Sequence, residues 1–539
     1  MKSKLVLLVT IVTLLFPNVN FGQAPDLGSA ANFVIFTSNG AVTNTGMSQN
    51  TGDIGSNSDS ITGFGNINGM MHIGDGESRQ CASDLLLAYH QLDTSTATFF
   101  PAATLGNGGT LVAGVYSISS AAIMNLNLYL DAQNNSDAVF IFQINGSFTT
   151  NASSKIILIN GAQASNVFWK VEGVVSMEAG TKMKGTVIAN NATINMNPGV
   201  SLEGRALSTK GAVTINGIHS RIPIVRGTTV LSGPVAPMLN STACFAIFSS
   251  EGTITNMGTS FITGDIGSNA ALTSGFDPLN VTGTIHTKPD ETTAQCAADL
   301  ATAYNYINTL DNDIQLMYPA LFGRGLVLTP HTYLLEGPTV LTDTLFLNAE
   351  GNPEAVFIIK INGSLKTSPY ANVVLINGAQ PENVYWKIEG PLDLNNYSVI
   401  RGTIICNNNI LGAMNIGVVL DGRILTTTGS LITSAITINI TGYCTNTGIQ
   451  VVDLTTAKES VTIDPNPFKY TTNVIINNLD EINNTELRIY NGTGQIVLNI
   501  PIYDQTTTIE TSNFPSGIYY YIILTDNELI QTGKIVSTQ

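Results

Sequence analysis

The chain contains the same blocks of sequence twice, and this duplication limits the fold more than any other feature. Residues 33–57 read FVIFTSNGAVTNTGMSQNTGDIGSN and residues 245–269 read FAIFSSEGTITNMGTSFITGDIGSN, with 16 identities in 25 positions. A second pair, INGAQASNVFWKVEG at 159–173 and INGAQPENVYWKIEG at 376–390, keeps 11 of 15. Because the blocks keep their order at nearly constant separation, the sequence predicts two copies of one domain.

The domain boundaries follow from the extent of each copy. We place the first domain at 24–223 and the second at 240–442, joined by a short linker that contains Gly233-Pro234 and Pro237. The remaining segments are the first 22 residues and residues 461–539, which contain motifs different from those of the two copies. A length of 539 residues agrees with several domains rather than one core.

The first 22 residues are typical of a secretory signal peptide. Lys2 and Lys4 precede an apolar run from Leu5 to Phe16 and a short polar stretch. A membrane anchor is the alternative, but the run is shorter than the ~20 residues needed to span a bilayer. No later segment is apolar enough to span either, so we expect an exported protein without a transmembrane segment in its mature form.

The sequence pattern of each copy predicts one helix and many short strands. In residues 78–92, the apolar side chains recur at helical spacing, and residues 292–310 form the matching segment of the second copy. Nearly everything else is short alternating strands rich in Val, Ile and Thr, broken by Asn-Gly, Gly-Asn or Pro-Gly. The fold class is therefore mainly β, with one long helix in each repeated domain.

Strands recur every 17 to 19 residues between Val174 and Ile218, which is one coil of a β-helix. Inward side chains of such coils stack into a core and outward ones form ladders at the strand spacing of about 4.8 Å. The expected inward residues are Val175, Met177, Ile194, Met196, Val213 and Ile215. The expected outward residues are Ser176, Glu178, Thr193, Asn195, Thr214 and Asn216.

The composition favours a polar but weakly charged surface. Only 11% of residues are charged and the formal net charge is −16, without a basic cluster, so nucleic acid is excluded as a partner. Polysaccharide lyases and hydrolases also use β-helices, yet we find no convergent pair of carboxylates. Asp53 and Asp265 recur singly beside glycines, and His72 and His286 recur without a second metal ligand. We therefore expect no enzyme activity, no metal and no cofactor.

Together the two copies resemble the bacterial and fungal ice-binding, or antifreeze, proteins of the DUF3494 type. The resemblance is carried by TGDIGSN (51–57, 263–269), His72 and His286, AVFIFQING (138–146) with AVFIIKING (355–363), the INGAQ blocks, and LEGRAL (202–207) with LDGRIL (420–425). It implies two discontinuous right-handed β-helix domains, each with a long helix alongside. The chain would start in one coil, pass through a cap and the helix, and return until its end packs beside its start.

The resemblance also implies adsorption to ice through a flat face that inhibits ice growth and recrystallisation. Its members often carry Thr-Ala/Gly-x-Thr/Asn turns, which the turns at 178–181, 197–200 and 395–398 of this chain do not match. The candidate ice-binding residues are Thr43, Thr45, Thr51, Thr181, Thr193, Asn195, Thr214, Thr253, Thr255, Thr263, Thr339, Thr342 and Thr344. An adhesin or structural solenoid that binds polysaccharide or another cell is the alternative function.

Five cysteines are present, and two of them flank the second copy without a counterpart around the first. Cys244 lies just before the first strand of that domain and Cys444 just after its last strand. If the end packs beside the start, as the resemblance implies, this pattern suggests a disulfide between them in an exported protein. Cys81, Cys296 and Cys406 are expected to be small buried thiols.

Residues 461–539 resemble the type A C-terminal sorting domain of the type IX secretion system, which occurs in the phylum Bacteroidetes. The motifs are DPNPF (464–468), LRIYNGTGQIV (487–497), FPSGIYYYIIL (514–524) and GKIV (533–536). The pattern predicts a small antiparallel β-sandwich with turns at Asn491-Gly492 and Ser516-Gly517. The resemblance implies recognition by the type IX machinery and release to the medium or the outer cell surface.

Overall fold

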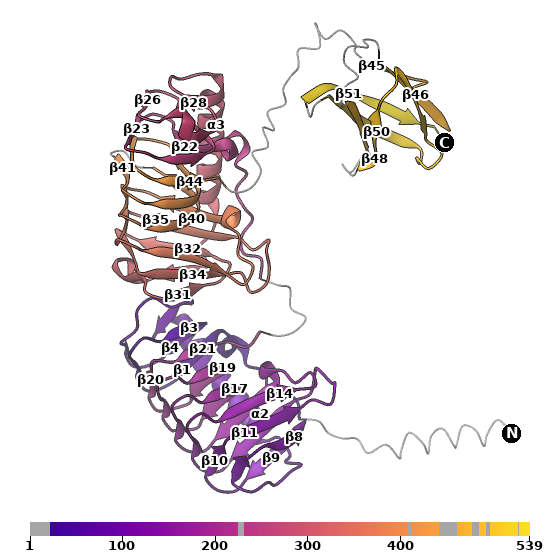
Figure 1. Cartoon of the computed structure of the whole chain (residues 1–539). Coiled ribbons are helices and arrows are strands. Elements are labelled where there is room, and N and C mark those ends of the chain that lie inside the picture. Colours follow the sequence, from indigo (N-terminus) through magenta and orange to yellow (C-terminus); the bar gives the residue numbers. More distant parts are fainter. Residues whose placement is uncertain are drawn as a thin grey trace, which may run out of the picture. The chain divides into compact units, whose positions relative to one another are not determined.

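The computed structural model describes residues 22–224, 231–407, 411–440, 461–476, 485–491, 496–525 and 528–538 (Figure 1). The chain forms two compact units, residues 1–448 and 449–539, and the first unit holds both repeated domains. Each repeated domain is a solenoid of parallel strands with one long helix alongside, so the predicted mainly-β fold is confirmed. The predicted signal peptide lies outside the described residues.

The first solenoid has three faces. The helix-covered face contains β6 (Met71–Ile73), β4 (Asp53–Ser56), β1 (Phe33–Thr37), the second halves of β19 (Ser201–Ser208) and β17 (Lys182–Ala189), then β15 (Val167–Val171), β12 (Phe140–Ile144) and β9 (Gly114–Ile118). The open face contains β5 (Ile61–Thr62), β2 (Val42–Thr45), β20 (Val213–Asn216), β18 (Ile194–Met196), β16 (Val175–Met177), β13 (Phe148–Thr150), β10 (Ala122–Asn125) and β7 (Thr104–Gly106). The charged face contains β3 (Gln49–Thr51), β21 (His219–Arg221), the first halves of β19 and β17, β14 (Lys155–Ile159), β11 (Asn127–Asp131) and β8 (Gly109–Val112).

The path of the chain explains the strand order. The first strands build the coils at one end, helix α2 (Gly76–Asp93) runs along the solenoid, and β7 to β20 return coil by coil. The last strand of the open face, β20, then pairs with the first, β2, through partners such as Val42 and Val213. The expected detour and return are therefore confirmed.

The inside of the first solenoid is an apolar stack. Aromatic rings of successive coils lie face to face, with centroid separations of 4.8 Å for Phe99–Tyr116, 5.1 Å for Tyr116–Phe142 and 3.9 Å for Phe142–Trp169. All the residues predicted to point inward between Val174 and Ile218 are buried. The core therefore follows directly from the coil period.

Glycines allow the longest strands to turn the corner between two faces. In β17, Gly185 has a φ of 97°, a conformation that side chains with a Cβ rarely adopt. In β19, a Cβ added to Gly204 would lie 1.9 Å from the carbonyl oxygen of Gly185. The backbones of adjacent coils approach too closely here for any other residue.

The helix of each solenoid packs against the helix-covered face through one apolar stripe. In α2, Cys81, Leu85, Ala88 and Leu92 are fully buried. The helix begins at Asp75, whose side chain accepts a hydrogen bond from the backbone N–H of Ser78 at 2.8 Å. Helix α3 (Glu291–Thr309) of the second solenoid begins with a complete capping box between Asp290 and Thr293.

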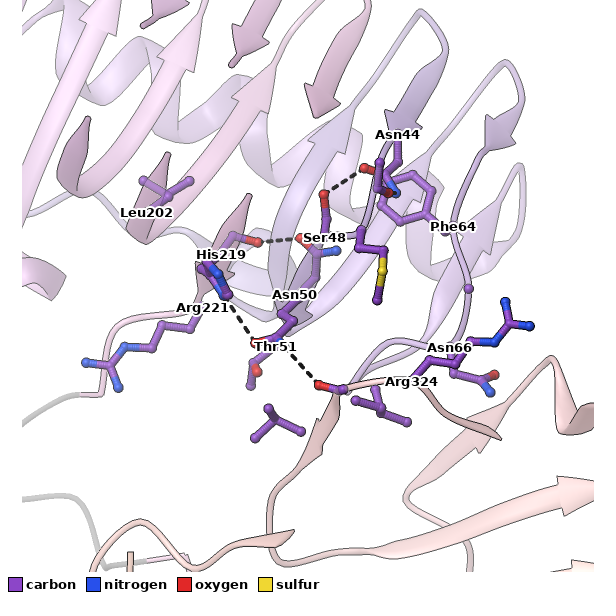
Figure 2. A pocket seen from close by; sticks show the side chains of 18 of the residues that line it. Asn44, Ser48, Asn50, Thr51, Phe64, Asn66, Leu202, His219, Arg221 and Arg324 are labelled. Atoms are coloured by element: carbon purple, nitrogen blue, oxygen red, sulfur yellow. Dashed lines mark hydrogen bonds between the residues drawn. The ribbon is translucent and has the colours of Figure 1, made fainter. Parts of the chain in front are cut away.

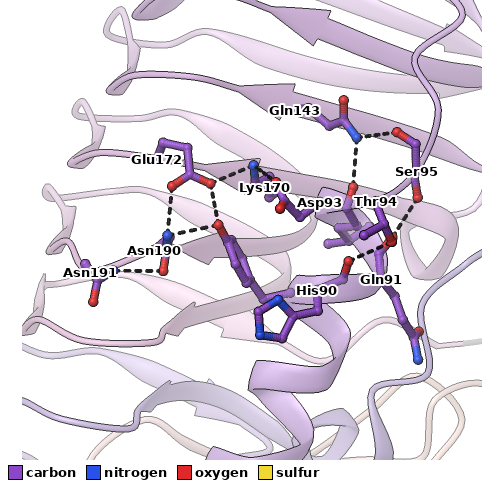
Figure 3. Close-up of polar contacts among 12 residues, drawn as sticks. His90, Gln91, Asp93, Thr94, Ser95, Gln143, Lys170, Glu172, Asn190 and Asn191 are labelled. Carbon is purple, nitrogen blue, oxygen red and sulfur yellow. Dashed lines mark hydrogen bonds and ion pairs between the residues drawn. The ribbon is translucent and has the colours of Figure 1, made fainter.

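A partly buried polar cluster fixes the end of α2 to the solenoid (Figure 3). The ammonium of Lys170 lies 2.5 Å from Asp93 of the helix and 2.6 Å from Glu172 of the solenoid. The hydroxyl of Tyr89 donates to Glu172 at 2.6 Å, and the Asn190 amide donates to both Tyr89 and Glu172. The second solenoid repeats the cluster with Lys387, Glu389, Tyr304 and Asn407. This network connects groups far apart in the sequence and sets the position of the helix.

The second solenoid repeats the same three-faced plan. Its helix-covered face contains β28 (Ile285–His286), β25 (Asp265–Ser268), β22 (Phe245–Ser249), parts of β42 (Val419–Thr426) and β40 (Val399–Cys406), β38 (Val384–Ile388), β35 (Phe357–Asn362), β32 (Thr332–Glu336) and β29 (Ile314–Leu316). The counterpart of the open face contains β26 (Thr273–Ser274), β23 (Ile254–Met257), β43 (Ser430–Ser434), β41 (Leu411–Met414), β39 (Leu392–Leu394), β36 (Leu365–Thr367), β33 (Thr339–Thr342) and β30 (Phe322–Gly323). The third face contains β27 (Val281–Thr282), β24 (Phe261–Thr263), β44 (Thr437–Asn439), parts of β42 and β40, β37 (Asn372–Ile376), β34 (Thr344–Asn348) and β31 (Leu326–Leu328).

The described cysteines fall into one disulfide-bonded residue and three free, buried thiols, as the sequence predicts. Cys244 is disulfide-bonded, and its predicted partner Cys444 lies outside the described residues. Cys81, Cys296 and Cys406 are free and buried, and burial raises the pKa of each thiol. These three thiols are therefore poorly reactive.

The C-terminal unit consists of two antiparallel sheets. One contains β45 (Val461–Asp464), β46 (Thr471–Ile476) and β49 (Thr506–Glu510), and the other contains β48 (Ile496–Ile502), β47 (Thr485–Tyr490), β50 (Gly517–Thr525) and β51 (Glu528–Ser537). Buried side chains from both sheets, among them Val474, Ile489 and Ile523, form one core. This arrangement is the predicted small sandwich. Gly492 of the predicted Asn491-Gly492 turn lies outside the described residues.

Substitution of Lys170 by Met should destabilise the first solenoid by about 2 kcal/mol, because Asp93 and Glu172 lose their cation in a partly buried site. Trp169 and Trp386 are the two tryptophans of the chain and are both fully buried. In a Trp386→Phe background, denaturation followed by fluorescence therefore reports on the first solenoid alone. The exposed Lys210→Met is the control, and equal loss in both variants would contradict the role of the cluster.

The same clusters predict loss of stability in acid. Burial opposes ionisation of Glu172 and Glu389, but hydrogen bonds from the neighbouring Asn, Lys and Tyr outweigh it, and the pKa of each carboxyl lies below its ordinary value. A carboxyl whose pKa is lower in the folded state than in the unfolded state stabilises the fold at any pH above its unfolded pKa. This stabilisation is lost as the pH falls through the folded-state pKa. The urea midpoint should stay level from neutral pH and fall below about pH 4.3. A Glu172→Gln variant should show a shallower decline in acid, and an unchanged slope would contradict this assignment.

Candidate functional site

Two faces of the first solenoid are unsuited to contact a large neutral surface. The helix-covered face is occupied by α2. On the charged face, Lys184, Glu203 and Arg221 stand in one outward row of paired strands, with Lys184–Glu203 at 2.5 Å and Arg221–Glu203 at 3.1 Å. Lys155 and Lys182 lie in the neighbouring row. The open face is the remaining candidate.

The open face presents a central row of small side chains in unbroken register. Paired positions of its eight strands place these residues next to one another in the order Thr62, Thr43, Thr214, Asn195, Ser176, Thr149, Ile123 and Thr104. None is buried, none is charged and five are threonines. Because parallel strands lie about 4.8 Å apart, the hydroxyl and methyl groups repeat at that spacing.

A row of amides borders the central row. Asn197 donates to Glu178 at 3.0 Å, Asn151 donates to Asn125 at 2.9 Å, and Asn125 donates to Asn107 at 2.8 Å. These bonds run from coil to coil and restrain the side chains at the edge of the face. Glu178 is the acidic residue among them, and its carboxylate accepts the bond from the Asn197 amide.

The turns beside the amide row keep the edge low. Ser153, Gly180 and Gly199 occupy the same turn position in successive coils, each with a left-handed backbone. With one serine and two glycines at this position, no large side chain rises above the edge of the sheet along these coils. An exception is Leu126, in the turn between β10 and β11, whose side chain is 62% exposed.

The counterpart face of the second solenoid has the same backbone but different chemistry. Its central row reads Ser274, Thr255, Ile432, Ala413, Asp393, Lys366 and Val340. Lys366 and Asp393 form an ion pair at 3.2 Å in the middle of the row. A single threonine remains, so this face lacks the regular uncharged ladder of the first.

The predicted surface residues separate by domain. In the first solenoid the open face carries Thr43, Thr45, Asn195 and Thr214, and Thr193 directly precedes β18 of that face, whereas Thr51 lies on the charged face. In the second solenoid Thr253, Thr255 and Thr342 lie on or beside the counterpart face. Thr263 and Thr344 lie on the third face of that domain.

Two candidate residues point inward and cannot contact an external surface. Thr181 is fully buried, 2.7 Å from the hydroxyl of Thr150, and Thr339 is 1% exposed. The prediction is wrong for both because a threonine can point inward where its hydroxyl finds a partner: Thr181 donates to the Glu178 carbonyl, and Thr339 donates to the Gly337 carbonyl. The sequence also missed Thr62, Thr104 and Thr149, which are accessible. Thr149 is 27 residues before Ser176, a longer coil than the period used for the prediction.

A cavity of about 850 Å³ lies where the two solenoids meet (Figure 2). Its walls come from β3 and β21 of the first solenoid and from residues 321–327 of the second. Nearby, Tyr333 donates to Asn68 at 2.7 Å and Asn68 donates to Thr329 at 2.9 Å, both within buried surroundings. Gln49 also donates to the carbonyl of Gly325 at 2.9 Å. These polar contacts connect the ends of the two domains.

The repeated acids and histidines have structural partners. His72 and His286 each lie within hydrogen-bond distance of the aspartate that caps the following helix, Asp75 and Asp290. Asp53 accepts a bond from the backbone N–H of Met70, and burial raises the pKa of its carboxyl. Over the described ranges, no three His, Cys, Asp or Glu side chains gather as metal ligands. Among these same residues, no helix is both long and apolar enough to cross a membrane.

Comparison with known proteins gives consistent matches to both parts of the chain. A model of the ice-binding-like family matches residues 36–220 and 248–439, and a model of a secretion system C-terminal sorting domain matches residues 462–538. An ice-binding protein of Nostoc sp. (strain HG1) is 36% identical over 198 residues, which are 35% of this chain and 71% of the relative. One from Flavobacterium frigoris (strain PS1) is 30% identical over 220 residues, 36% of this chain and 76% of the relative.

A solved structure matches both solenoids at once. It is the crystal structure of an ice-binding protein from an Antarctic bacterium, Flavobacteriaceae, with 51% sequence identity and a TM-score of 0.74. The match covers 78% of this chain and 100% of that one. The tandem arrangement therefore has a counterpart of known structure.

A matched pair of substitutions tests the placement of the threonines. Thr214→Val should change the free energy of unfolding by less than about 0.5 kcal/mol, because the hydroxyl faces outward. Thr181→Val should cost about 1.5 kcal/mol, because the buried Thr150 hydroxyl loses a partner. Denaturation followed by Trp169 fluorescence in the Trp386→Phe background measures both, and equal costs would contradict the inward placement of Thr181.

Proposed function

This chain belongs to the ice-binding-like family, and from that premise we propose that it adsorbs to ice through the open face of its first solenoid. Ice binding is the function of the chain, but membership of the family does not show which face of which solenoid contacts the ice. The observation that carries the proposal is the unbroken central row from Thr62 to Thr104, five of whose eight members are threonines.

The chemistry of this row suits an ordered layer of water. A threonine places a methyl group and a hydroxyl at each strand, so water held between the methyl groups can also hydrogen-bond to the face. A charged side chain orients its hydration water strongly, and that water does not fit a lattice. Adsorbed protein then makes ice grow as curved fronts between bound molecules, which lowers the local freezing point and slows recrystallisation.

Rigidity supports the same proposal. The coil-to-coil amide bonds and the fully packed core restrain the face before it meets ice, so little side-chain freedom remains to be lost on binding. The second solenoid contributes less to ice adsorption, because the Lys366–Asp393 pair lies in the middle of its counterpart face. Thr255 and Thr342 are accessible there but do not form a continuous row.

Export follows from the C-terminal unit, which is a type IX secretion sorting domain. The protein is therefore delivered to the outside of the cell, where ice forms. We propose that residues 1–22 serve as the signal peptide for the first step of that export. The matched family is a family of binding proteins and not of enzymes, and we propose that the two solenoids act by adsorption without catalysis.

The double variant Thr43→Tyr/Thr214→Tyr should abolish most of the ice affinity, since two rings raised above the central row prevent close contact. We expect thermal hysteresis and partition into growing polycrystalline ice to fall at least about tenfold, equivalent to ~1.4 kcal/mol. The unfolding midpoint should stay the same, because both side chains face solvent.

Two controls accompany this measurement. Thr110→Tyr places a ring at an exposed position of the charged face, and Thr255→Tyr places one on the counterpart face of the second solenoid. Both should retain ice partition. If Thr255→Tyr lost it while the double variant kept it, the ice-binding face would belong to the second solenoid.

A further inference from the structure

The second solenoid carries an exposed aromatic column that the first solenoid lacks. The rings of Tyr370 and Tyr397 are stacked, with centroids 5.2 Å apart and planes within 13°. Tyr370 is 71% exposed and Tyr397 48%. A Cβ added to Gly417 would lie 2.3 Å from the Tyr397 ring, so Tyr397 is covered by Tyr370 on one face and by the backbone at Gly417 on the other.

The same turn position in the first solenoid is occupied by small residues. The backbone N–H groups of Tyr370 and Tyr397 donate to the next coil at Asn396 and Ile416, and those of Ser153 and Gly180 donate equivalently to Ala179 and Pro198. Tyr370 and Tyr397 have φ values of 62° and 59°, in the left-handed region that disfavours residues with a side chain. Two large rings therefore occupy positions where glycine would be less strained.

The column ends in an uncovered ring face. Tyr370 is stacked on one side by Tyr397, and its large exposed fraction leaves the other side to solvent. The preceding turn of the column holds Asp343, whose carbonyl accepts from the Asn372 N–H at 2.8 Å and whose side chain is exposed. On the adjoining strand, Lys366 is also exposed. Asp343 therefore lies in the turn before Tyr370 in the column, and Lys366 lies four residues before Tyr370 on β36, where it is paired with Asp393.

From this geometry we propose that the tyrosine column, Asp343 and Lys366 bind a neutral polysaccharide of β-linked pyranose units. The C–H face of a pyranose packs on the electron-rich face of an aromatic ring, as the Tyr370 ring allows. The Asp343 carboxylate accepts hydrogen bonds from sugar hydroxyls, and Lys366 donates to ring or hydroxyl oxygens. Tyr397 is covered on both faces, so only the open face of Tyr370 can pack on a sugar, and one unit of the polymer stacks there.

Charge selects this ligand class over other stacking ligands. Nucleic-acid bases also stack on tyrosines, but their phosphates are repelled by Asp343, by Asp393 and by a chain with a net charge of −16. Acidic polysaccharides meet the same repulsion. The first solenoid would then bind ice and the second would bind a neutral surface polymer. When both ligands are on one surface, each site increases the avidity of the other.

Calorimetric titration of the full chain with hexamers of β-1,4-linked glucose and of β-1,4-linked N-acetylglucosamine tests the proposal. At least one should bind with a Kd of about 1 mM or tighter. Tyr370→Ser, which copies Ser153 of the first solenoid, should weaken binding at least about tenfold, while Tyr370→Phe should retain it. Tyr503→Ser, which removes a tyrosine that is 79% exposed in the C-terminal unit, is the matched control and should not change binding.

Binding of neither hexamer, or equal binding by the Tyr370→Ser variant, would overturn the site. Tighter binding of polygalacturonate would overturn the neutral class, and equal loss in Tyr503→Ser would mean unspecific adsorption to aromatic rings. An ultraviolet difference spectrum of tyrosine on adding hexamer to the unaltered chain gives a second measurement that needs no variant. Ice partition is measured on the same proteins: Tyr370→Ser should keep it, and Thr43→Tyr/Thr214→Tyr should keep hexamer binding, so the two functions can fail separately.

Discussion

The coil-to-coil register of parallel strands is the constraint on which the rest of the structure depends. Every coil must place an inward residue above the inward residue of its neighbour, as the stack from Phe99 to Trp169 shows. The bends at Gly185 and Gly204 keep this register while the strands change face. Once the register is fixed, an outward residue is set beside its counterpart whatever its chemistry.

This separation between a fixed inside and a free outside explains how the two copies diverged. The helix-capping aspartates and the Lys–Glu–Tyr–Asn cluster recur in both copies, and the core positions stay apolar although many of their residues differ. The outward rows differ, with threonines and amides in the first solenoid and an ion pair with a tyrosine column in the second. Duplication supplied two identical frames, and the exposed rows then acquired different surface chemistry.

Much of the fold could be predicted from the sequence because repetition and periodicity report on the core. The two domains, their helices and the inward residues from Val175 to Ile215 were all accessible in this way. The outward face was harder to predict, because a threonine can also point inward when its hydroxyl has a partner there. Thr181 is buried in this way, and the 27-residue coil that separates Thr149 from Ser176 hides the row to which both belong. The contacts of Asn68 with Tyr333 join positions 265 residues apart, which no local pattern indicates.

The pairing of β2 with β20 has a consequence for how a solenoid comes apart. In an ordinary repeat array the chain ends are the outermost coils and fray first. Here both ends of the first solenoid meet inside the stack, and its outermost strands, β5 and β7, come from the middle of the sequence. Unfolding from either end of the domain must therefore separate β2 from β20, which lie between β5 and β18 in the sheet. The terminal strands of the domain are thus held by neighbours on both sides.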